Sequence, residues 1–132
     1  MSRNAAILTL AAVVLLSFVS SFSVAYGAGP KPSTTRWSGY LIDLACARER
    51  KDVEPDLGPQ HTKKCMLMPA CNRNGFGLLT DANELLPFDE NSNSKVRTLL
   101  RRTNQSGDLR VVVQGTMAND ILQIRKIELK KR

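Results

Sequence analysis

Histidine and cysteine are scarce in this chain of 132 residues, which has one histidine and three cysteines. No C-x2-C pair, glycine-rich phosphate-binding loop or nucleophile elbow occurs, and there is no internal repeat or low-complexity tract. The common zinc-knuckle, nucleotide-binding and hydrolase motifs are therefore excluded. A Cys–His pair can form a thiolate nucleophile, but no third orienting group is evident in the sequence. We therefore expect no enzyme activity.

Negative charge is also in short supply. The chain carries 19 Lys and Arg residues against 12 Asp and Glu residues, a formal net charge of +7, and loss of Arg3 with a leader would leave +6. Such a balance favours anionic surfaces. The basic residues are spread along the chain, however, apart from residues 101–102 and the terminal Lys-Lys-Arg. We expect no nucleic-acid partner.

The only long apolar stretch stands at the beginning of the chain. After Arg3 it runs without charge from Ala5 to Tyr26, and small residues follow it. This pattern is typical of a secretory signal peptide, here residues 1–27, although the run is also long enough for an uncleaved anchor. No twin arginine and no cysteine near the cleavage site is present. We expect a periplasmic or secreted protein with no stable membrane insertion after cleavage.

The rest of the chain divides into a flexible linker, residues 28–35, and one mainly β domain, residues 36–132. Alternating apolar residues and turn signals predict the strands, and the i, i+3, i+4, i+7 spacing of Val96, Leu99, Leu100 and Thr103 predicts a helix that begins after the cap residues 91–94. The predicted strands span residues 36–43, 75–81, 84–88, 109–117 and 120–129.

The order of these elements is characteristic. One helix falls between the third and fourth strands, and a long insertion without strand pattern, residues 44–74, separates the first two. A five-stranded OB-like Greek-key barrel has its helix in the same place. In the last strand Leu122 and Ile124 share one face, and a bulge near Arg125–Lys126 would return Ile127 and Leu129 to that face. We therefore expect a mainly β fold, a five-stranded OB-like Greek-key barrel with a Cys- and His-bearing insertion between its first two strands.

The insertion contains every cysteine and the only histidine. Pro59 can open a helix and Pro69 must end it, which predicts a helix over residues 60–68. His61, Cys65 and Met68 would then share one face. Three thiolates and one imidazole suit a closed tetrahedral zinc site, whereas participation of Met68 would favour monovalent copper. The predicted metal ligands are Cys46, His61, Cys65 and Cys71.

A disulfide is the alternative, because exported cysteines oxidise. A Cys65–Cys71 or Cys46–Cys71 bridge would staple the insertion to the barrel, leaving one thiol over, and the domain would be a non-enzymatic structural or protein-interaction module. Asp43 ends the first strand three residues before Cys46. It is either an ordinary turn residue or a hydrogen-bonding partner of His61.

Four segments of the chain, "WSGYLIDLACA", "HTKKCMLMPACNRNGFGLLT", "LPFDENSNSKVRTLL" and "LRVVVQGTMANDILQIRKIEL", resemble a group of small exported bacterial proteins of unknown function. The resemblance covers almost all of the chain after the leader. It implies an OB-like barrel and export, and it implies no particular activity. The shared positions are Gly39, Asp43, Cys46, His61, Thr62, Cys65, Cys71, Gly75, Gly77, Phe88, Asp89 and Gly115.

Overall fold

The computed structural model describes residues 33–131. The predicted signal peptide and most of the predicted linker lie outside the described residues, so both stay predictions. All five predicted strands are confirmed, each end within one residue of its expected position. In chain order the elements are β1 (Thr35–Asp43), α1 (Leu44–Arg50), α2 (Leu57–Gln60), α3 (Lys63–Met66), α4 (Pro69–Asn74), β2 (Phe76–Thr80), β3 (Leu85–Pro87), α5 (Glu90–Arg102), β4 (Arg110–Ala118) and β5 (Ile121–Leu129).

The five strands form one antiparallel sheet in the order β3-β2-β1-β4-β5. The β4–β5 hairpin turns through Asn119 and Asp120, both with positive φ, as a tight two-residue hairpin turn requires. Gln114 pairs with Lys126 while Gly115 pairs with Ile124, so Arg125 is the extra residue of a bulge. The predicted bulge is confirmed.

The mainly β fold is confirmed, but the sheet is not closed into a barrel, which corrects the predicted barrel. Its two edges meet only in an isolated parallel bridge between Phe88 and Leu122 within the part of the chain that the structure describes. The physical reason lies in the edge strand β3, which is three residues long. Two residues after β3, Asp89 already caps α5, so the chain leaves the sheet before a ladder with β5 can form.

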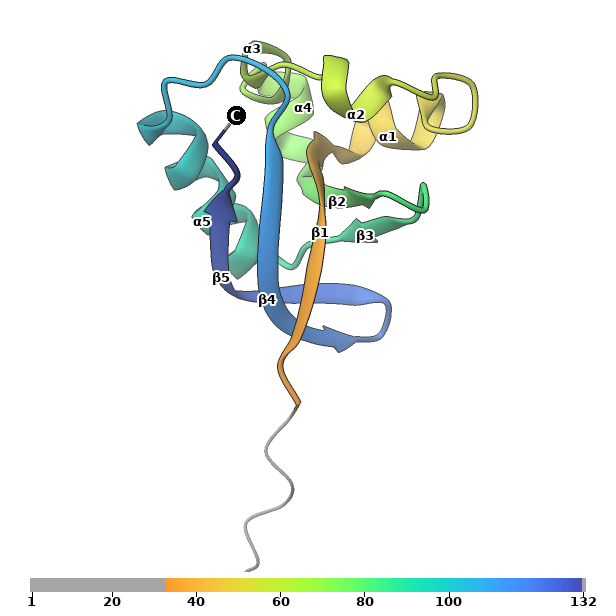
Figure 1. Cartoon of the computed structure of the whole chain (residues 1–132). Helices are drawn as coiled ribbons and strands as arrows, with labels where there is room; N and C mark the ends of the chain where they lie inside the picture. Colours follow the sequence, from red (N-terminus) through yellow and green to blue (C-terminus); the bar gives the residue numbers. More distant parts are fainter. Residues whose placement is uncertain (1–32, 132) are drawn as a thin grey trace, which may run out of the picture. The chain divides into compact units, whose positions relative to one another are not determined.

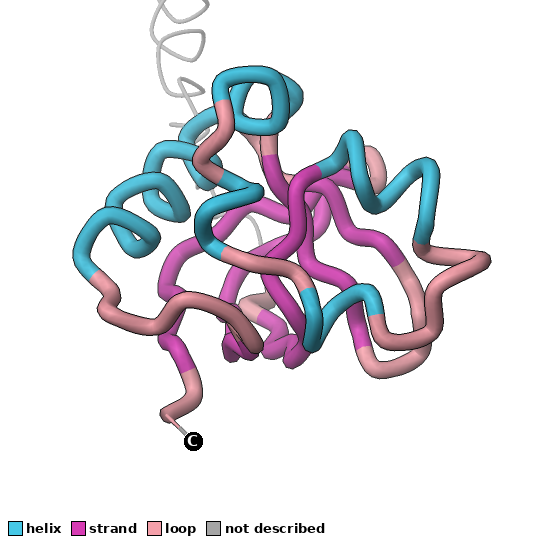
Figure 2. The backbone as a smooth tube through the Cα atoms, turned by 90° about the horizontal axis from the view of Figure 1, so that it is seen from above, coloured by secondary structure: helices cyan, strands magenta, loops and turns pink. Residues whose placement is uncertain are grey.

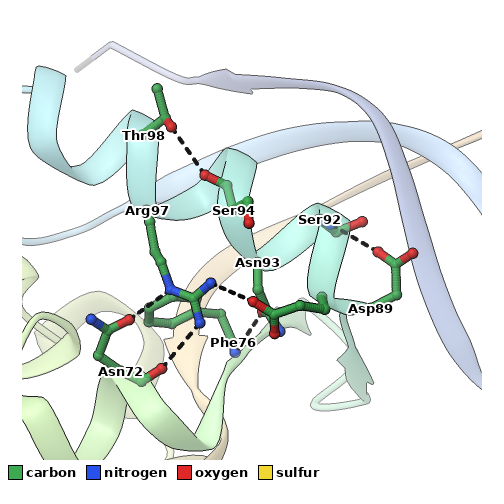
Figure 3. Close-up of polar contacts among 9 residues, drawn as sticks. Asn72, Phe76, Asp89, Ser92, Asn93, Ser94, Arg97 and Thr98 are labelled. Carbon is green, nitrogen blue, oxygen red and sulfur yellow. Dashed lines mark hydrogen bonds and ion pairs between the residues drawn. The ribbon is translucent and has the colours of Figure 1, made fainter.

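Helix α5 begins at Glu90, so the predicted cap residues 91–94 lie inside the helix and that predicted start is wrong. The N-cap is Asp89, whose side chain accepts the Ser92 amide at 2.8 Å. Figure 3 shows how its first turns are tied to the neighbouring chain. Asn93 Oδ1 accepts the Phe76 amide at 2.9 Å, and Arg97 Nε donates to Asn72 Oδ1 at 2.9 Å. These bonds join α5 to the end of α4 and the start of β2, the segment that follows the cysteines.

The insertion between β1 and β2 folds into four short helices gathered at one end of the sheet (Figure 1). Seen from that end, in Figure 2, the helices lie over the strands. The predicted continuous helix over residues 60–68 is wrong. His61 and Thr62 are extended and separate α2 from α3, because Thr62 pairs with Gly107 in an isolated bridge.

Two apolar clusters hold these layers together. The larger lies between the sheet and α5 and includes Phe76, Val113 and Leu122, together with Met66 from the insertion. The smaller packs Ala47 of α1 and Leu57 of α2 against the other side of the sheet, so it positions the insertion. Among the described helices, none is long and apolar enough to cross a membrane.

Candidate metal centre

Asp43 is the residue on which the centre is built. It ends β1 and caps α1, with Oδ1 accepting the Cys46 amide at 2.9 Å. Its side chain is fully buried. The second oxygen, Oδ2, lies 2.7 Å from Nε2 of His61, which is also buried. One carboxylate therefore positions a cysteine-bearing helix and faces the only histidine.

Each cysteine is the third residue of a short helix: Cys46 in α1, Cys65 in α3 and Cys71 in α4. In α3 the hydroxyl of Thr62 accepts the Cys65 amide at 3.2 Å, as Asp43 does for Cys46 in α1. Side-chain caps of this kind satisfy the free amides at the start of a helix. Two cysteines are therefore fixed by local capping rather than by their place in a long helix.

His61 is held in its extended conformation by the loop that precedes β4. The Asp108 amide donates to the Pro59 carbonyl at 3.2 Å, and the Lys63 amide donates to the Ser106 carbonyl at 2.8 Å. These bonds flank His61 on both sides. The loop thus directs the imidazole toward the end of β1.

The structure brings together four side chains of the kinds that can bind a metal ion. The ligand atoms of Asp43, Cys46, His61 and Cys65 all lie within 4.8 Å of one another. Ligands of a tetrahedral zinc ion lie about 3.3–3.8 Å apart, since bonds to zinc are about 2.0–2.3 Å long. The cluster therefore needs only small adjustments to surround an ion.

Three of the four predicted ligands belong to this cluster, and Asp43 joins them. Cys71 is not one of the four, although it is buried and interacts electrostatically with Asp43 and Cys65. Its role as a ligand stays a prediction. Met68 is half exposed and lies at the N-cap of α4.

The contact between Asp43 Oδ2 and His61 Nε2 is short but poorly aligned for a hydrogen bond. Although 2.7 Å separates them, neither Oδ2 of Asp43 nor Nε2 of His61 has a hydrogen bond of acceptable geometry, and both atoms are buried. The two side chains therefore attract each other across a short distance without an optimally directed hydrogen bond. Buried polar atoms without partners cost free energy, and an ion is one of the groups that can satisfy them.

Burial and charge shift the proton affinities of the cluster. Burial by itself would raise the pKa of Asp43, but the His61 imidazole and the Cys46 amide outweigh burial and lower it. Burial, followed by the nearby Asp43 carboxylate or a neighbouring thiol, raises the pKa of all three cysteines. Without an ion the centre holds an ionised carboxylate beside protonated thiols.

No disulfide joins the three cysteines. Sequence reasoning found the possible link between Asp43 and His61 but not the place of Asp43 among the four. A local signal was present: a capping residue three positions before a cysteine occurs in "DLAC" and again in "TKKC". That spacing places the cap side chain and the cysteine in the same first turn.

Comparison with known proteins does not assign the chain to a family. No protein-family model, no curated protein and no solved structure matches the chain. Function must therefore be argued from the centre itself.

Proposed function

We propose that this protein is an exported binding module that holds a zinc ion through Asp43, Cys46, His61 and Cys65. The observation that carries the proposal is the gathering of four ligand atoms, from Asp43, Cys46, His61 and Cys65, within 4.8 Å of one another. Within this group, the buried contact between Asp43 Oδ2 and His61 Nε2 lacks good hydrogen-bond geometry. A cation would satisfy both atoms and favour the thiolate form of both cysteines. The leader at the beginning of the chain supports export.

The donor set favours zinc over monovalent copper. One oxygen, one nitrogen and two sulfurs form a mixed set that suits zinc, whereas monovalent copper prefers softer, sulfur-rich surroundings. Met68, the thioether that the sequence offered for a copper site, is 50% exposed. It would have to leave solvent to complete a copper site.

A binding role is better supported than a catalytic one. Four protein ligands would close a tetrahedral site, whereas catalytic zinc sites keep one position for water or substrate. The raised pKa of Cys46 and Cys65 also opposes a reactive thiolate in the metal-free protein. A cavity of about 380 Å³ borders Tyr40, Gly58 and Arg110, and none of the four cluster residues lines it.

We further propose that the domain is an opened OB-like Greek key. The strand order β3-β2-β1-β4-β5 and the helix between β3 and β4 support this assignment. Folds of that type are often only partly closed and use the connection between the first two strands for binding. The zinc centre would occupy that connection.

Zinc binding to the reduced protein, purified from the exported fraction, tests the proposal. A competition titration with a chromophoric chelator should show one bound zinc per chain. Cys46→Ser, Cys65→Ser and His61→Ala should abolish tight binding. Asp43→Asn keeps a capping oxygen for α1 and isolates the metal role: loss like that of the cysteines marks a ligand, and a loss of about 10–100-fold marks an outer partner of His61.

Lys64→Ala is the matched control, because Lys64 is exposed and neighbours Cys65. It should bind zinc like the wild type. Circular dichroism in EDTA should first show that each variant is folded. A folded, reduced wild type that binds no zinc would refute the proposed function.

A further inference from the structure

We infer that the centre is gated by oxidation: Cys46 and Cys65 form a disulfide in the oxidised protein, and this disulfide excludes the metal ion. The inference rests on the proposed function, since it concerns the regulation of the same site. It assigns the same two sulfurs to two mutually exclusive bonds.

Distance is the first support. The Sγ atoms of Cys46 and Cys65 lie within 4.8 Å of each other. A disulfide brings two sulfurs to about 2.05 Å, so a further approach of less than about 3 Å is needed. The two cysteines lie on separate short helices, α1 and α3, each only one or two turns long. Short helices at the end of a sheet can make such a shift without rearranging the strands.

Access is the second support. Cys46 and Cys65 are both partly exposed, whereas Cys71 is buried. An external oxidant therefore reaches the two cluster thiols before it reaches the third. Cys71 also interacts with Cys65, and this makes a Cys65–Cys71 bridge the competing outcome.

The chemistry is thiol–disulfide exchange with an external disulfide, either a small molecule or a dithiol–disulfide oxidoreductase. One cluster thiol loses its proton and attacks the external disulfide, which forms a mixed disulfide and releases one sulfur of the reagent as a thiol. The second cluster thiolate then attacks the mixed disulfide and releases the other thiol. The two cysteines are oxidised by two electrons, the reagent is reduced by two, and the two thiol protons leave with the released thiols.

Loss of the ion follows directly. A disulfide between Cys46 and Cys65 removes two of the four donors, and the remaining Asp43 and His61 are too few for a closed zinc site. The linkage works in both directions, because an ion that binds only the reduced form opposes oxidation. Free zinc at 100 times its dissociation constant should lower the equilibrium constant for oxidation about 100-fold. This corresponds to about 60 mV in the reduction potential of a two-electron couple.

The experiment equilibrates the full chain in mixtures of reduced and oxidised glutathione, with EDTA or with buffered free zinc. Peptide mapping should locate a Cys46–Cys65 disulfide, and bound zinc should fall as that disulfide forms. Free zinc at 100 times its dissociation constant should shift the midpoint of the glutathione titration by about 60 mV. Cys71→Ser is the matched control and should keep both zinc binding and the disulfide, while Cys46→Ser and Cys65→Ser should lose both.

Three results would overturn the inference: a disulfide mapped to Cys71, zinc retained by the fully oxidised protein, or a midpoint that zinc leaves unchanged. Failure of the proposed zinc binding would give a different result from failure of the gating. If the reduced protein binds no zinc, there is no metal for oxidation to release. Peptide mapping of the oxidised protein would still show whether Cys46 and Cys65 form a disulfide.

Discussion

Asp43 shows how much of this centre depends on one side chain. Its Oδ1 caps α1 through the Cys46 amide, and its Oδ2 faces Nε2 of His61. An ionised carboxylate in a fully buried position is stable only with such partners. Asp43 therefore fixes the start of α1 and also influences which groups of the centre are protonated.

The first prediction concerns the pH dependence of stability in the metal-free protein. The pKa of Asp43 is lowered in the folded state, below its unfolded value of about 3.9. Its contribution to stability is therefore complete above that value and is lost as the pH falls through the folded pKa. The pKa of Cys46 is raised above its unfolded value of about 8.5. The contribution of Cys46 is complete below that value and is lost as the pH rises through the folded pKa.

Urea unfolding in EDTA and reductant, from pH 3 to pH 10, measures both losses. Stability should fall at each end of this range. Asp43→Asn should reduce the acid loss and Cys46→Ser the alkaline loss. An acid limb unchanged by Asp43→Asn would contradict the assignment.

At the scale of elements, the insertion is built from helices that cannot stand alone. α3 has four residues, far fewer than an isolated helix needs in water. It is fixed by the Thr62 cap, by the Thr62–Gly107 bridge and by the buried Met66. The position of Cys65 is therefore set by the tertiary contacts of its helix.

The second prediction removes this cap. Thr62→Ala should cost about 0.5–2 kcal/mol of stability, because the Cys65 amide loses its acceptor. Zinc affinity should fall too, since Cys65 is then less well positioned. Thermal unfolding and chelator competition measure the two effects. Thr62→Ser keeps the hydroxyl and should restore both, and a variant that fails to do so would show that the cap is not the cause.

At the scale of the whole molecule, the sheet determines where the helices of the insertion lie. β1 carries Asp43 at its end, and β4 pairs with β1 over six residues. The backbones of β4 and β5 approach each other so closely at one position that only glycine fits there. A Cβ atom on Gly115, next to the bulge, would lie 2.1 Å from the Gln123 carbonyl oxygen.

The third prediction tests which face of β4 packs into the core. Val113 has no exposed surface in the main core, so Val113→Asp would bury an unpaired charge. Its cost should exceed the stability of an ordinary domain, about 5–15 kcal/mol, and the variant should not fold. Arg110→Ser, in the same strand, removes partly exposed contacts with Asp81 and with the ring and hydroxyl of Tyr40. It should cost about 1–2 kcal/mol and leave the variant folded. Circular dichroism and urea unfolding distinguish the two, and equal tolerance would contradict the assigned core face.

The strands, the β4–β5 turn and the bulge at Arg125 could be predicted because each depends on local alternation and turn chemistry. The concentration of cysteine and histidine in one insertion was also visible. It pointed to Cys46, His61, Cys65 and Cys71, of which the first three belong to the cluster. These features need only neighbouring residues.

The break between α2 and α3 depends instead on Thr62 pairing with Gly107, which is 45 positions away in the chain. The open sheet depends on where Asp89 caps α5 relative to β5. The place of Asp43 in the centre depends on two segments meeting at the end of β1. Local sequence determined which groups were available for a metal site, and tertiary packing decided which of them meet, because long-range contacts override the local helical preference of the insertion.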